Sequence, residues 1–152
     1  MKRAISAVLP AVVIVAVALA VGGATPGGTA AYERHHHFET IGRAFKGVND
    51  QIKRRPSNLA AIRTTTAVLA TLASRVKTWF PEGSGPQNGV KTDALPAAWT
   101  NRAELERQAD RFAAASRNLS VAAEGGDIAA IQAAARATGE TCKSCHDQFR
   151  KR

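Results

Sequence analysis

The chain has 152 residues, of which 45% are hydrophobic and 5% aromatic, and this length suits one domain together with a targeting segment. It carries 21 Lys and Arg against 12 Asp and Glu, a formal net charge of +9. The basic residues are dispersed, apart from residues 53–55 and 150–152, and no aromatic residues interleave with them, which argues against nucleic-acid binding. Such a basic surface is either ordinary and solvated or attracts acidic redox partners or an anionic membrane.

The N-terminal segment has the layout of a secretory signal peptide. A short basic start precedes an apolar run over residues 4–21 and a tail of small residues. We place the cleavage near Ala30 or Ala31, so that residues 1–31 form the leader and residues 32–152 the mature domain. An uncleaved membrane anchor is the alternative, because an apolar run of about 18 residues is at the lower limit for a bilayer span.

The first two helices are expected between the leader and the middle of the chain. Apolar residues recur at steps of three and four over residues 32–54, and Pro56 ends this segment because it disfavours the α conformation in the residue before it. The apolar positions are Phe38, Ile41, Phe45, Val48 and Ile52. The second helix is expected to begin at Ser57 or Asn58, either of which can cap it, and to end with Phe80.

The second half of the chain begins with a loop rich in Gly and Pro over residues 81–95, of the kind that often lines a site. The third helix is expected to begin between Asp93 and Ala97 and to end at Gly125. The fourth is capped by Asp127 and continues nearly to the C-terminus. Its inner positions follow intervals of three and four and form a heptad seam, namely Ile128, Ile131, Ala135, Thr138, Cys142, Cys145 and Phe149. Four amphipathic helices without strand-like alternation predict an all-α protein, an antiparallel four-helix bundle.

The sequence Cys-Lys-Ser-Cys-His at residues 142–146 carries the clearest chemistry. On a helix, Cys142 and Cys145 lie one turn apart on one face, and His146 shares that face. This pattern is typical of covalent attachment of c-type haem, with thioether bonds to the two cysteines and His146 as the axial ligand of the iron. The small residues along the seam before Cys142 leave room for a porphyrin. We therefore expect one covalent haem c.

Three other interpretations of the cysteine pair fit less well. A thioredoxin-like redox pair needs a βαβ context, and the predicted elements are all helical. Structural zinc usually takes four Cys or His ligands, whereas the chain has two Cys and four His, three of them consecutive at residues 35–37. A disulfide between the two cysteines would join only neighbouring turns of one helix.

The sequence resembles the cytochrome c′ family, in which the haem motif lies near the C-terminus of a four-helix bundle. The matching segments are residues 142–151, Phe80–Gly85, Leu95–Trp99, Gly126–Asp127, and Arg34, Phe38 and Ile41 in the first helix. Ala97 and Ala98 depart from the Pro-Glu-Ile-Trp stretch of the family. The resemblance covers the whole predicted mature chain.

The resemblance implies contacts between the haem and residues far from the cysteines. Arg34 would lie by a haem propionate, with His35 beside it. Phe80 and Asp93 would border the haem, and Arg150 would cover its proximal side. Without the resemblance, Phe80 would be read as a core aromatic and the charged residues as ordinary surface groups.

The ligand opposite His146 decides between gas binding and simple electron transfer. The resemblance implies that Phe38 occupies the distal face over the iron, and that relatives with six-coordinate iron use a methionine from the first helix. The only methionine of this chain is Met1, in the predicted leader. Because Phe38 cannot ligate iron, we expect a five-coordinate, high-spin haem. His37 is an alternative distal ligand, and the ordinary interpretation of residues 35–37 is an exposed polar cluster.

These features predict a periplasmic c-type cytochrome that binds NO or CO, carries electrons, or does both. The alternative is a low-spin, six-coordinate electron-transfer cytochrome with the same bundle fold. The expected partners are small diatomic gases and a redox partner protein, and the resemblance implies a homodimer through the first two helices. The sequence shows no arrangement of catalytic side chains, so we do not expect an enzyme.

Overall fold

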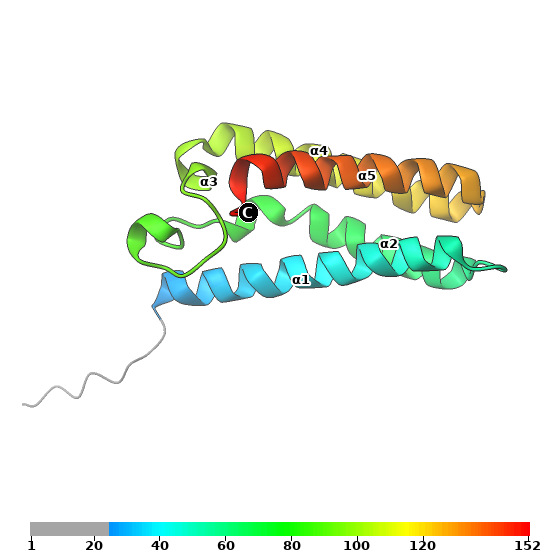
Figure 1. The fold of residues 1–152 in the computed structure, drawn as a ribbon, viewed down its shortest axis with the longest axis horizontal. Coiled ribbons are helices and arrows are strands. Elements are labelled where there is room, and N and C mark those ends of the chain that lie inside the picture. Colours follow the sequence, from blue (N-terminus) through cyan, green and yellow to red (C-terminus); the bar gives the residue numbers. More distant parts are fainter. Residues whose placement is uncertain (1–24) are drawn as a thin grey trace, which may run out of the picture.

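The computed structural model describes residues 25–152, and most of the predicted leader, residues 1–24, lies outside the described residues. Four long helices form an antiparallel bundle, in which α1 and α2 make one layer and α4 and α5 the other (Figure 1). Their bounds are Pro26–Lys53 for α1, Leu59–Ala73 for α2, Arg102–Gly125 for α4 and Ile128–Phe149 for α5. The predicted four-helix bundle is confirmed. None of the helices between residues 25 and 152 is long and apolar enough to cross a membrane.

Helix α1 begins earlier than the sequence suggests. Thr25 caps it, because its hydroxyl oxygen accepts a hydrogen bond from the backbone N–H of Gly28 at 3.1 Å, and Pro26 occupies the first turn. The helix start lies against the loop over residues 81–95, since a Cβ added at Gly27 would be 2.2 Å from the carbonyl oxygen of Gly83. The helix thus extends into the segment that the sequence analysis assigned to the leader. The position of the cleavage stays a prediction.

The second predicted helix ends at Ala73, seven residues before the expected Phe80. After it, Ser74 donates its hydroxyl to the carbonyl of Thr71, and the next turn tightens into the 3₁₀ helix η1, Val76–Trp79. Hydroxyl side chains near a helix end compete for backbone carbonyls in this way. The break turns the rings of Trp79 and Phe80 into the core, where each is 6% exposed.

The third predicted helix is also divided, at Asn101, into the short α3, Ala97–Thr100, and α4. The loop before it contains a second 3₁₀ helix, η2, Pro86–Asn88. Both the predicted loop and the predicted start near Ala97 are confirmed. The division places Trp99 and Arg102 beside the loop, where their side chains hold its backbone.

The core runs along the bundle between the two layers. Helix α1 packs along α2, α5 packs along α4, and α2 joins the layers by packing on α4, whereas α1 and α5 meet over only a short stretch. The predicted inner seam of α5 is confirmed, with Ile131, Ala135, Thr138 and Phe149 buried and both cysteines partly buried against the core. The α1–α5 side is therefore the one side on which the bundle is not closed.

Candidate functional site

The register of α1 against α5 can be followed from one close contact. A Cβ added at Gly139 would lie 3.5 Å from Cζ of Phe45, so the ring of Phe45 rests on this glycine. The two helices are antiparallel (Figure 1), and equal steps away from the contact therefore reach the same level of the bundle. Phe38 lies seven residues before Phe45 and His146 seven residues after Gly139. Phe38 and His146 thus lie at one level on opposite sides of the α1–α5 gap.

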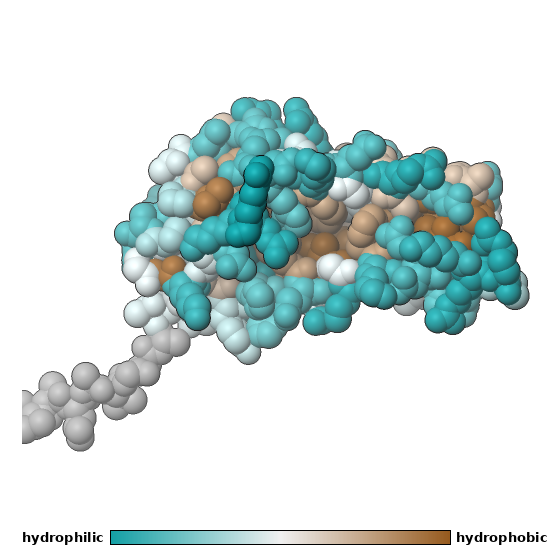
Figure 2. All heavy atoms as spheres, in the orientation of Figure 1, coloured by the Kyte–Doolittle hydropathy of each residue, from teal (hydrophilic) through white to brown (hydrophobic). Residues whose placement is uncertain are grey.

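This gap is an apolar cleft. Figure 2 shows hydrophobic residues exposed along the middle of the face between α1 and α5, with hydrophilic residues on either side. The partly buried hydrophobic residues packed on the core include Phe38 and Phe45 from α1 and Cys142 and Cys145 from α5. An exposed apolar trough in a small protein is typical of a binding site for an apolar group.

The two cysteine thiols are free and half-buried. Burial raises the pKa of Cys142, and it raises the pKa of Cys145 to about 11, with a further contribution from the neighbouring Cys142. Both thiols are therefore protonated at neutral pH. Cys142 lies three residues after Gly139 and shares its α1-facing side. The structure thus brings both predicted attachment residues to the cleft.

His146 lies at the cleft and is exposed in the described structure. Its pKa is lowered, first by desolvation and then by the positive charge of Arg150, while Asp147 acts in the opposite direction. The neutral imidazole is the form that ligates a metal ion. Lys143 pairs with Asp147 on the exposed side of the helix, away from the core.

An aromatic cluster borders the cleft on the side of α1. The ring of Phe38 makes an edge contact with Trp79, with centroids 5.3 Å apart, and lies 6.2 Å from Phe80. Phe80 in turn contacts Trp99 at 5.6 Å. The resemblance implied that Phe38 and Phe80 both border the haem, and in the structure their rings belong to one cluster. Sequence reasoning missed the place of Trp79, because that depends on the break after α2.

Arg34 is buried, with 3% of its surface exposed, beneath the loop between η1 and α3. Its two Nη atoms donate four hydrogen bonds of 3.0 Å to the carbonyls of Trp79 and Ser84 and the hydroxyls of Ser84 and Thr92. Its guanidinium also lies 5.0 Å from the ring centre of Phe80. No carboxylate pairs with it among the described residues, and burial lowers its pKa. Its predicted role beside a haem propionate stays a prediction.

Asp93 and Arg150 are brought together by backbone pairing at the end of α5. The loop residue Ala94 forms an isolated bridge with Arg150, and the backbone N–H of Lys151 donates to the carbonyl of Asp93 at 2.8 Å. The backbone N–H of Arg150 donates to the carbonyl of His146 at 3.1 Å. Both side chains are exposed. The predicted neighbours of the haem thus lie at the same end of the bundle as His146.

The three consecutive histidines diverge. His35 and His36 are exposed and contact the carboxylate of Glu39, at 3.5 and 3.1 Å. His37 is instead stacked on Trp79, with ring centroids 4.6 Å apart, which holds it between α1 and η1. Within residues 25–152, no three His, Cys, Asp or Glu side chains converge as a metal-ion site.

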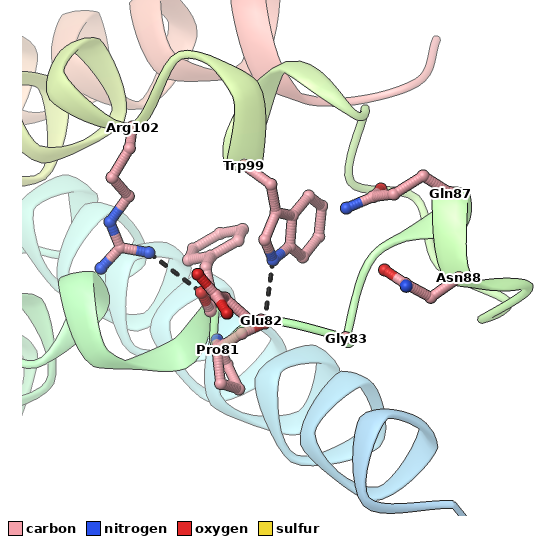
Figure 3. Close-up of a pocket in the computed structure, with 8 residues that line it drawn as sticks. Pro81, Glu82, Gly83, Gln87, Asn88, Trp99 and Arg102 are labelled. Atoms are coloured by element: carbon pink, nitrogen blue, oxygen red, sulfur yellow. Dashed lines mark hydrogen bonds between the residues drawn. The ribbon is translucent and has the colours of Figure 1, made fainter.

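A second hollow lies behind the aromatic cluster, over the loop that follows η1 (Figure 3). Two hydrogen bonds cross it: Trp99 donates its indole N–H to the carbonyl of Pro81 at 2.9 Å, and Arg102 donates to the carbonyl of Phe80 at 2.9 Å. The chain around Phe80 is thus held by side chains of α3 and α4. Trp99 and Arg102 therefore fix the backbone of the segment that carries Phe80, on the side away from the cleft.

Comparison with known sequences identifies a family for this chain. A family model described as cytochrome C′ matches residues 29–150. The cytochrome c′ of Rubrivivax gelatinosus is 35% identical over 117 residues, which are 77% of this chain and 84% of that protein. The cytochrome c′ of Alcaligenes xylosoxydans xylosoxydans is 32% identical over 116 residues, 76% of this chain and 83% of that protein.

Solved structures show the same likeness. The crystal structure of the Rubrivivax gelatinosus cytochrome c′ has a TM-score of 0.75 and 34% identity, covering 82% of this chain and 97% of the other. A nitric oxide complex of a cytochrome c prime mutant from Alcaligenes xylosoxidans has a TM-score of 0.75 and 28% identity, covering 83% and 97%. The cytochrome c′ of Thermochromatium tepidum, at 21% identity and a TM-score of 0.78, shares the fold over 86% of this chain and all of the other.

Proposed function

The chain belongs to the cytochrome c′ family and is a c-type cytochrome with covalent haem c, and we propose that this haem occupies the α1–α5 cleft, bonded to Cys142 and Cys145. The observation that carries the proposal is that the one open side of the bundle holds two free, half-buried thiols one turn apart. The apolar cleft suits a porphyrin, and the small residues of the α5 seam leave room for it. When bound, haem iron supplies diatomic-gas binding and one-electron transfer.

The surrounding residues fit this cofactor. His146 would ligate the iron from α5. Its pKa is lowered, chiefly by desolvation, and this favours the neutral imidazole. Arg34 is a buried cation without a carboxylate partner in the described chain, and a haem carboxylate would supply the missing negative charge. Phe80, Asp93 and Arg150 would border the cofactor at the same end of the bundle. His35, which faces solvent with Glu39, would be its most distant neighbour.

We further propose that the iron is five-coordinate and binds NO or CO. Phe38 lies across the cleft at the level of His146 and has no atom that ligates iron. His37 is stacked on Trp79, between α1 and η1, which speaks against it as a distal ligand. The solved nitric oxide complex of an Alcaligenes relative supports gas binding in this family. Electron carriage by the same haem is compatible with this site, and a six-coordinate electron-transfer protein is the alternative.

The absorption spectrum of the reduced protein tests whether the sixth coordination position is open. The variant Phe38→Ala tests whether Phe38 restricts access of a gas to that position. We expect a high-spin spectrum without added ligand, because Phe38, which lies across the cleft from His146, has no atom that ligates iron. In Phe38→Ala we expect CO to associate about tenfold faster, since relieving a crowded contact is worth ~1–3 kcal/mol. Flash photolysis of the CO complex measures this rate.

One outcome would contradict the open site, and a second would contradict the role of Phe38. A sharp low-spin α band in the unliganded ferrous protein would show a sixth ligand. An unchanged CO rate in Phe38→Ala would show that Phe38 does not guard the iron. Phe112→Leu is a suitable control, because Phe112 is a buried aromatic of α4 and lies on another helix than Phe38.

Export to the periplasm is also part of the proposal, since the N-terminal pattern is that of a leader. A cut at Ala30 or Ala31 would remove the Thr25 cap and the contact of Gly27 with Gly83. A mature chain that begins at Thr25 would keep α1 whole. We therefore expect intact-mass analysis of periplasmic protein to show a start at or before Thr25. A start at Tyr32 would support the sequence-based boundary, and retention of Met1 would contradict cleavage.

A homodimer through α1 and α2 completes the proposed function. Small or apolar side chains are exposed on α2, among them Ala60, Ala67 and Val68, the last with 45% of its surface exposed. Short side chains allow two helices to approach closely. Sedimentation equilibrium measures the molar mass in solution. We expect the mass of a dimer, and the mass of a monomer would contradict this proposal.

A further inference from the structure

The two tryptophans of the chain differ in how their indole N–H groups are used. Trp99 donates its N–H to the carbonyl of Pro81 at 2.9 Å. The indole nitrogen of Trp79 is buried and has no hydrogen-bond partner among the described residues. A buried N–H without an oxygen acceptor costs ~1–3 kcal/mol, which the packing of the Trp79 ring has to offset. The ring contacts of Trp79 are therefore the part of its environment that the structure defines.

Trp79 is held from several sides by one stretch of α1. His37 stacks on its ring, with the planes inclined by 25°. Arg34 donates to its backbone carbonyl at 3.0 Å. Both contacts come from residues that precede Phe38 in α1, within one turn of it, and the 3₁₀ turn of η1 fixes the backbone of Trp79. The indole is therefore rigidly placed between α1 and the end of η1.

The indole also contacts the ring of Phe38. Their rings meet edge to face, with an interplanar angle of 88° and centroids 5.3 Å apart, which is a favoured aromatic geometry. The ring of Phe80 lies further from Phe38 than the indole does, with the Phe38 and Phe80 centroids 6.2 Å apart and their planes inclined by 60°. Phe38 is only partly buried and borders the open cleft, so its ring has free space on one side. Trp79 is thus a wall that limits how far the ring of Phe38 can turn away from the cleft.

We propose that Trp79 is a positioning residue for Phe38: clamped by His37 and Arg34, it holds the Phe38 ring over the distal side of the cleft and so sets the space open to an incoming gas. This rests on the proposed function, in which Phe38 faces the iron. The flat, rigid ring of Trp79 provides the surface against which the Phe38 ring rests.

The test uses the haem-loaded protein and a double-mutant cycle. Trp79→Leu, Phe38→Ala and the double variant are compared with wild type by CO flash photolysis. We expect Trp79→Leu to raise the CO association rate about fivefold when Phe38 is present, as for other contacting pairs, and to leave it unchanged in the Phe38→Ala background. The infrared band of bound CO should broaden or split in Trp79→Leu, because the Phe38 ring then takes several orientations.

Two further variants guard against a general loss of folding. Trp79→Phe keeps an aromatic wall and should stay within about twofold of the wild-type rate. Trp99→Leu removes the other tryptophan, which contacts Phe80 rather than Phe38, and should leave the CO band unchanged. If Trp79→Leu does not fold with haem, Trp79→Val and Trp79→Met provide the same comparison.

The outcomes separate this inference from the proposed function. A six-coordinate wild-type protein without added ligand would overturn the proposed function, whatever Trp79 does. An open wild-type site in which Trp79→Leu changes the rate equally with and without Phe38 would overturn the positioning role alone. An unchanged rate and an unchanged CO band in Trp79→Leu would also overturn it.

Discussion

Replacing both Cys142 and Cys145 with serine is expected to abolish covalent haem attachment. The thioether bonds form at the cysteine sulfur atoms, and a serine hydroxyl does not replace a thiol in this reaction. Both thiols lie at the one open side of the bundle. Intact mass under denaturing conditions measures the result, because only a covalent group stays on the unfolded chain. We expect the full mass increment of one haem in wild type and none in the double variant.

A matched control lies within the same motif. Lys143→Ala changes a residue between the two cysteines, but its amino group pairs with Asp147 on the exposed side of α5. It should therefore leave haem attachment complete. A double serine variant that still carries haem after denaturation would contradict the assignment of the cysteines. Loss of haem in Lys143→Ala would show that any substitution in this segment disrupts haem attachment, so that the double serine variant would not report on the two sulfur atoms alone.

The double variant also bears on stability. The cleft walls include Phe38 and Phe45, and these rings contact solvent where haem is absent. A group that binds only the folded protein stabilises it. A lower thermal unfolding temperature in the haem-free variant than in wild type is the expected consequence.

The sequence predicts the attachment site well because that site is local. Cys142, Cys145 and His146 lie within five residues of one helix, and helical geometry alone places them on one face. The heptad seam of α5 then predicts which side of that helix turns toward the core. The confirmed burial of Ile131, Ala135 and Thr138 shows that this periodicity determines the packing.

The aromatic wall of the cleft could not be predicted in the same way. The periodicity of the second helix continues to Phe80, so it gives no sign of the break after Ala73. The break depends on Ser74, whose hydroxyl takes the carbonyl of Thr71, and on the gain from burying Trp79. A competition between local hydrogen bonds and tertiary packing is not visible in a hydrophobic pattern.

The environment of Arg34 is the least local feature of the site. Its acceptors lie 45, 50 and 58 residues away along the chain, in η1 and the loop that follows. In the sequence, Arg34 is one charged residue on an amphipathic helix, beside three histidines. Only the folded loop shows that this one arginine, unlike the exposed Arg43, is buried.

Replacing Arg34 with alanine is expected to destabilise the protein by about 1–3 kcal/mol, because it leaves buried carbonyl and hydroxyl oxygens without their hydrogen-bond donor. The carbonyls of Trp79 and Ser84 and the hydroxyl of Thr92 would lose their donors inside the protein. The loop would then lose its attachment to α1. Urea unfolding of wild type and variant, compared through their midpoints at equal slope, measures the difference.

Arg34→Lys and Arg43→Ala sharpen this test. Lysine keeps the charge but has a single nitrogen, which cannot reach the acceptors that the two Nη atoms bridge, so an intermediate loss is expected. Arg43 lies on the same helix but is exposed and only 3.8 Å from Glu39, and its replacement should change stability by less than about 0.5 kcal/mol. If Arg34→Ala lowers the free energy of unfolding by no more than Arg43→Ala does, the loop is held by contacts other than those of the Arg34 guanidinium. A loss confined to Arg34 would show that the cation proposed to face a haem carboxylate also fastens the loop behind Phe80, so that the distal wall and the charge of the site depend on one residue.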